Sequence, residues 1–65
     1  MPIIIDHQLK QELKQQKLRS LMARFFELEM DKVAHEANGL MEGANSLQKE
    51  MDKVQKAYDA IELMG

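Results

Sequence analysis

Apolar residues recur every three or four positions from Ala23 to Ile61, the heptad spacing of a helix that packs along a partner helix. This predicted seam consists of Ala23, Phe26, Met30, Val33, Ala37, Leu40, Ala44, Leu47, Met51, Val54, Tyr58 and Ile61. Asn38 and Gly39 fall in its middle, and Gly43 follows. The pattern predicts an all-α protein, either a helical hairpin or one continuous helix in a coiled coil.

The expected hairpin has a helix over about 7–37, a turn over about 38–45 and a helix over about 46–63. Two glycines inside one continuous helix would cost about 2 kcal/mol relative to alanine, which favours the hairpin. The heptad spacing that continues across Gly39 favours the continuous helix instead.

Residues with capping properties stand at the expected helix ends. Asp6 is placed to cap the first helix, and Asn38-Gly39 has the form of a C-cap because both residues adopt the left-handed conformation cheaply. Asn45, with Gln48 three residues later, resembles a capping box at the start of the second helix.

Between residues 18 and 37 the apolar positions span roughly 200° of a helical wheel, wider than one neighbouring helix requires. A lone hairpin is expected to leave Leu21, Phe25 and Leu28 exposed, and two hairpins pairing into a four-helix bundle would bury them. The expected core and dimer interface comprises Leu18, Leu21, Met22, Phe25, Phe26, Leu28, Met30, Val33, Leu47, Met51, Val54, Tyr58 and Ile61.

The length of 65 residues allows a single small domain, whose core is marginal on its own. Chains of this size commonly gain stability from disulfides, a metal ion or oligomerisation. Because the chain contains no cysteine, disulfides and thiolate metal sites are excluded. We therefore expect a homodimer, with a higher oligomer as the alternative.

The segment 1–17 differs from the rest of the chain. Leu9 and Leu13 are the only apolar side chains from residue 7 to residue 17, and they fall nearly opposite Leu18 and Leu21 on the wheel. We therefore expect this segment to protrude as an extended or helical arm that presents the two leucines to a partner protein.

Charge is divided unevenly along the chain. Residues 6–24 carry five basic and two acidic side chains, a net +3, whereas residues 25–42 carry one basic and five acidic, a net −4. Lys10, Lys14, Lys17 and Arg24 share one side of the first helix and form a basic stripe that could follow a phosphate backbone. Nucleic-acid binding is therefore the alternative function.

Constellations for catalysis are nearly absent. The sequence has no glycine-rich phosphate loop and no nucleophile elbow, so we expect no enzyme activity and no cofactor. Asp31 and His35 have the i, i+4 spacing of two metal ligands, and Glu27 lies one turn earlier. The Glu-x-x-His pairing of carboxylate bundles is missing because Lys32 occupies its first position. A metal site near the turn is thus a third, weaker alternative.

The apolar run Ile3–Ile5 is too short for a signal-peptide core or a membrane span, so a cytoplasmic location without membrane contact is expected. The sequence as a whole favours a small helical protein that acts through protein–protein contacts, as an adaptor, an assembly factor or a regulatory subunit.

Overall fold

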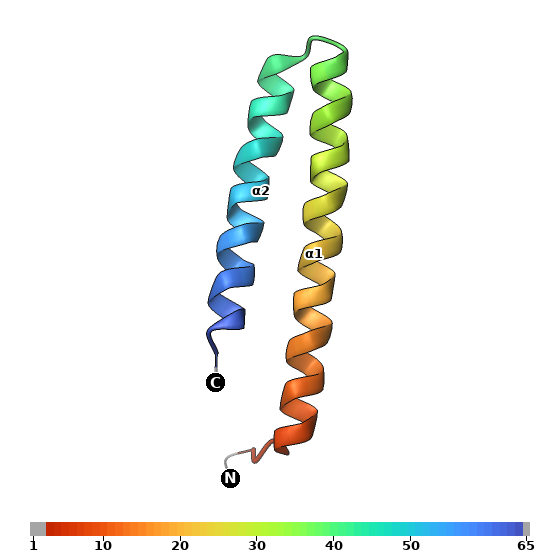
Figure 1. The fold of residues 1–65 in the computed structure, drawn as a ribbon. Helices are drawn as coiled ribbons and strands as arrows, with labels where there is room; N and C mark the ends of the chain where they lie inside the picture. Colours follow the sequence, from red (N-terminus) through yellow and green to blue (C-terminus); the bar gives the residue numbers. More distant parts are fainter. Residues whose placement is uncertain (1–2, 65) are drawn as a thin grey trace.

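Two antiparallel helices make up the computed structural model, which describes residues 3–64 (Figure 1). Helix α1 spans His7–Ala37 and helix α2 spans Met41–Glu62. The described residues contain no strand, and the molecule is elongated, 54 × 19 × 15 Å along its principal axes. The predicted hairpin is confirmed, and the continuous rod is wrong.

The chain reverses through a Schellman motif at the end of α1. Leu40 N–H donates to the carbonyl oxygen of His35 (2.8 Å) and Gly39 N–H to that of Glu36 (3.0 Å), so carbonyls at the helix end are satisfied. Gly39 has φ 72°, the left-handed conformation that this motif requires, while a Cβ atom there would meet nothing within 4 Å. Glycine is needed at position 39 for its backbone, not for space.

The connection is shorter than predicted. It covers residues 38–40, and α2 begins at Met41 instead of Ser46. Asn45 therefore lies inside α2, and the predicted capping box at Asn45 and Gln48 is wrong. The reason is that the Schellman motif completes the reversal by Leu40, whose carbonyl oxygen already accepts the first α2 hydrogen bond from Ala44 N–H (3.0 Å).

Asp6 does occupy the N-cap position of α1, in an extended backbone conformation with φ −57° and ψ 137°. Its carbonyl oxygen accepts a hydrogen bond from Lys10 N–H (2.9 Å), but its side chain makes no capping hydrogen bond. The helix start is thus as predicted, while the cap is a backbone cap only.

The core is a single seam between the two helices. Leu18 and Leu28 of α1 and Ala44, Met51 and Val54 of α2 are its buried apolar residues. Three partly buried side chains, Leu21, Phe25 and Leu47, pack against Leu28, Met51 and Val54. The α2 half of the predicted heptad seam therefore faces α1.

The α1 half of the predicted seam does not face α2. Phe26, Met30 and Val33 are exposed, as are Ala23 and Ala37. A different heptad of α1, which includes Leu18, Leu21, Phe25 and Leu28, takes the contact with α2. No helix in the described part of the chain has both the length and the apolarity to cross a membrane.

Candidate interaction surface on helix α1

Four large apolar side chains of α1 form an exposed line that we call the outer stripe: Met22, Phe26, Met30 and Val33. Their exposed fractions are 52%, 57%, 49% and 59%. At 100° per residue, the stripe lies about 115° around α1 from the centre of the positions that face α2. The hairpin thus buries one apolar face of α1 and leaves a second face bare.

This arrangement reverses one prediction. Leu28 is buried, and Leu21 and Phe25 pack against the core, although a lone hairpin was expected to expose all three. That the wide apolar surface of α1 has a second neighbour stays a prediction. Helix α2 covers one side of this surface, and it is the side that was expected to be exposed.

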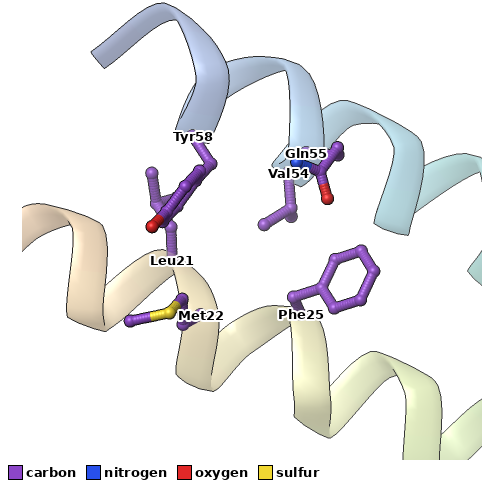
Figure 2. Close-up of a pocket in the computed structure, with 6 residues that line it drawn as sticks. All are labelled: Leu21, Met22, Phe25, Val54, Gln55 and Tyr58. Carbon is purple, nitrogen blue, oxygen red and sulfur yellow. The ribbon is translucent and has the colours of Figure 1, made fainter. Parts of the chain in front are cut away.

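A groove between the helices borders the outer stripe. Leu21, Met22 and Phe25 from α1 and Val54, Gln55 and Tyr58 from α2 line this cavity of about 360 Å³ (Figure 2). Met22 belongs to both features, so the groove and the stripe form one continuous apolar surface. An apolar surface of this kind on a small protein is typical of a site where another protein docks.

Polar side chains of α1 contact α2 at its C-terminal end and at Gln48. The Lys14 ammonium donates to the carbonyl oxygens of Glu62 (2.9 Å) and Met64 (2.7 Å) at the C-terminal end of α2. A cation is favourable there because the final carbonyls of a helix lack partners within it. Nearer the turn, Lys32 donates to the side-chain oxygen of Gln48 (2.6 Å).

The His35 ring packs against Gly43 of the other helix. Its Nδ1 shares a hydrogen bond with the carbonyl oxygen of Asp31 (2.8 Å), which orients the ring toward α2. A Cβ atom built on Gly43 would lie 2.5 Å from Cδ2 of this ring, so only glycine leaves room for the imidazole. Sequence reasoning missed this role of Gly43, which was assigned to the turn.

The metal-site candidates Asp31, His35 and Glu27 do not form a ligand group. In residues 3–64, no three His, Cys, Asp or Glu side chains stand close enough together to hold a metal ion. His35 contacts the backbone carbonyl of Asp31 instead of its carboxylate. The i, i+4 spacing therefore brings the His35 ring to a backbone carbonyl oxygen of its own helix.

The segment predicted as an arm includes the first turns of α1, which extend past the end of α2 (Figure 1). Leu9 and Leu13 are about half exposed. Leu13 also lines a cavity of about 360 Å³ with Ile5, Ile61 and Met64, at the open end of the hairpin. The part of the predicted arm at residues 1 and 2 lies outside the described residues.

The four members of the predicted basic stripe differ in their surroundings. Lys10, Lys17 and Arg24 are exposed and form no ion pair with any described residue. Lys14 is half-buried and is engaged by the α2 carbonyls. Three free cations therefore remain on this side of α1.

Comparison with known proteins finds no matching family model, no matching curated protein and no matching solved structure.

Proposed function

We propose that this protein is a non-enzymatic interaction module that works as a homodimer, in which two hairpins pair into a four-helix assembly. The observation that carries the proposal is the outer stripe, where four large apolar side chains of one helix remain half exposed. Adaptor, assembly-factor and regulatory-subunit roles all require such a surface.

The thin core supports self-association. Five apolar residues are buried among the described residues, all in one seam between two helices. Stable domains commonly enclose their core between packed layers, and chains of this size without disulfides commonly add a layer by oligomerising. A second hairpin on the outer stripe would enclose α1 between α2 and a new neighbour.

Sedimentation equilibrium of the wild-type chain and of Phe26→Asp tests the proposal. We expect the wild type to reach twice its 7.5 kDa chain mass as its concentration is raised to several hundred micromolar. Phe26→Asp should remain monomeric, because association would bury an unpaired carboxylate.

Asn45→Asp is the matched control, because it adds the same charge at an exposed position of α2 near the helix start. This variant should dimerise like the wild type. Circular dichroism verifies that Phe26→Asp is still helical. A wild-type chain that stays monomeric throughout the concentration range overturns the homodimer.

A second candidate function, nucleic-acid binding, is favoured by the three free cations Lys10, Lys17 and Arg24. It predicts binding to labelled RNA or DNA that weakens steeply from low to physiological salt. The triple substitution of these residues by glutamate should abolish it. Lys14 is left unchanged in this variant because it holds the end of α2. No binding at low salt rules the candidate out.

A further inference from the structure

We infer that the outer stripe is covered by the outer stripe of a second copy running antiparallel, with the two α1 helices in the centre and each α2 outside. The inference rests on the proposed homodimer and specifies its geometry. Phe26 of one copy packs against Met30 of the other, on either side of a two-fold axis.

The spacing along the exposed face of α1 reads the same in both directions. Arg19, Ala23, Phe26, Met30, Val33 and Ala37 follow one another by four, three, four, three and four residues. Reversing one helix about a point between Phe26 and Met30 therefore aligns every position with another member of the set. Ala23 then meets Val33, and Arg19 meets Ala37. A two-fold axis demands such self-complementarity.

The same line of positions becomes polar toward the N-terminus of α1, at Gln8, Glu12, Gln15 and Arg19. A parallel pair would bring Arg19 against Arg19 and Glu12 against Glu12 at the contact, where like charges repel. In the antiparallel pair Arg19 lies opposite a small alanine instead. Residues 8–15 extend past Ala37, where α1 of the second copy ends, and remain in water.

Charge division along α1 also favours the antiparallel pair. The segment 6–24 has a net charge of +3 and the segment 25–42 a net charge of −4. Antiparallel alignment about the point between Phe26 and Met30 places residues 14–24 of each copy (net +4) beside residues 32–42 of the other (net −1), and residues 25–31 (net −3) beside the same residues of the other copy. Parallel alignment places every segment, the basic one included, beside its own counterpart. Complementary charge of this kind selects orientation more than it adds affinity.

The face of α1 that carries the stripe is free of contacts to α2, so both hairpins can keep their internal packing in the dimer. The groove beside Met22 adds apolar surface next to the stripe and remains open to side chains of the second copy. Nothing within the hairpin has to move for the two copies to meet.

Disulfide trapping tests whether the two α1 helices run antiparallel. Because the wild-type chain has no cysteine, only the introduced cysteines can form a disulfide. Ala23→Cys and Val33→Cys are made separately, one of them with 15N label, then mixed and mildly oxidised. Positions 23 and 33 are opposite each other in the antiparallel pair, whereas position 23 lies about 15 Å from its own copy. Disulfide formation requires Cα atoms less than about 7 Å apart.

We expect mass spectrometry to show that most covalent dimers join a labelled to an unlabelled chain. Dimers that instead join Ala23→Cys to itself, and Val33→Cys to itself, show a parallel pair and overturn the inference. Sedimentation of the uncross-linked variants separates the remaining outcomes. Association without any disulfide shows that another face is used and overturns this inference alone, whereas absence of association overturns the proposed homodimer as well.

Discussion

The imidazole of His35 lies over Gly43, so that a Cβ atom at position 43 would come within 2.5 Å of the ring. The ring is also tied to Asp31 of its own helix through a 2.8 Å hydrogen bond between Nδ1 and the carbonyl oxygen. The pair sits beside the turn that joins the helices, and the ring limits how closely they can approach there. A polar residue and a glycine thus extend a core that is otherwise apolar.

Gly43→Ala is expected to destabilise the hairpin by about 1 kcal/mol or more, because the new methyl group displaces the His35 ring and its hydrogen bond. A loss of stability would be informative, because replacing glycine by alanine in a helix interior ordinarily stabilises a protein by about 1 kcal/mol. Urea denaturation followed by circular dichroism measures the change.

The same Gly43→Ala substitution in a His35→Ala background provides the control. With the ring removed, the intrinsic preference for alanine should return and stability should rise by about 1 kcal/mol. Equal effects of Gly43→Ala in the two backgrounds would show that the His35 ring does not constrain position 43.

Lys14→Met should loosen the C-terminal end of α2, because it removes the donor to the carbonyl oxygens of Glu62 and Met64. We expect a loss of about 1 kcal/mol in the free energy of unfolding. Amide hydrogen exchange should increase in the last turn of α2 and stay unchanged near the hairpin turn. Lys49→Met, at an exposed lysine of α2, should change neither quantity.

Leu28→Ala and Phe26→Ala should separate the hairpin core from the outer stripe. Leu28 is buried against Met51 and Val54, so its truncation should cost about 2–3 kcal/mol at every protein concentration. Phe26→Ala should leave the dilute hairpin within about 0.5 kcal/mol of the wild type.

Thermal unfolding at several protein concentrations distinguishes the two effects. The midpoint of the wild type should rise with concentration because a dimer is stabilised by mass action, and Phe26→Ala should flatten this dependence. A midpoint that is independent of concentration in the wild type would contradict the predicted role of Phe26.

Leu9→Ala with Leu13→Ala tests the arm. Both side chains are about half exposed, and they lie outside the buried residues of the hairpin core. We expect the double variant to keep the self-association of the wild type but to lose partners captured from native lysate. Unchanged capture would show that the two leucines do not form a partner surface.

Helix α1 shows where sequence reasoning succeeded and failed. Its bounds follow from an unbroken run of helix-forming residues and from the Asn38-Gly39 cap, both of which are local properties. The prediction of which face of α1 packs against α2 was wrong, because two heptads of apolar residues overlap on this helix. The heptad with the longer apolar run, from Ala23 to Ala37, lies outside the hairpin core.

The heptad that does face α2 was not recognised in the sequence, because the residues at both of its ends are polar. It runs through Gln11, Lys14, Leu18, Leu21, Phe25, Leu28, Lys32 and His35, all of which are buried or half-buried. A search for apolar periodicity follows this heptad only from Leu18 to Leu28. The next members on either side are lysines and a histidine, side chains that are usually exposed to water. The partners of these polar side chains are distant in the sequence. Lys14 contacts carbonyl oxygens at the end of α2, Lys32 contacts a glutamine, and the ring of His35 contacts a glycine.

By itself the sequence determined that the chain is helical, the bounds of α1 and the inward face of α2, because propensity, capping and a single apolar stripe are local signals. Only the tertiary structure decided which of two apolar faces of α1 meets α2, since both have the required spacing. Contacts of Lys14 and His35 with α2 favour one face, and the other is left as the outer stripe.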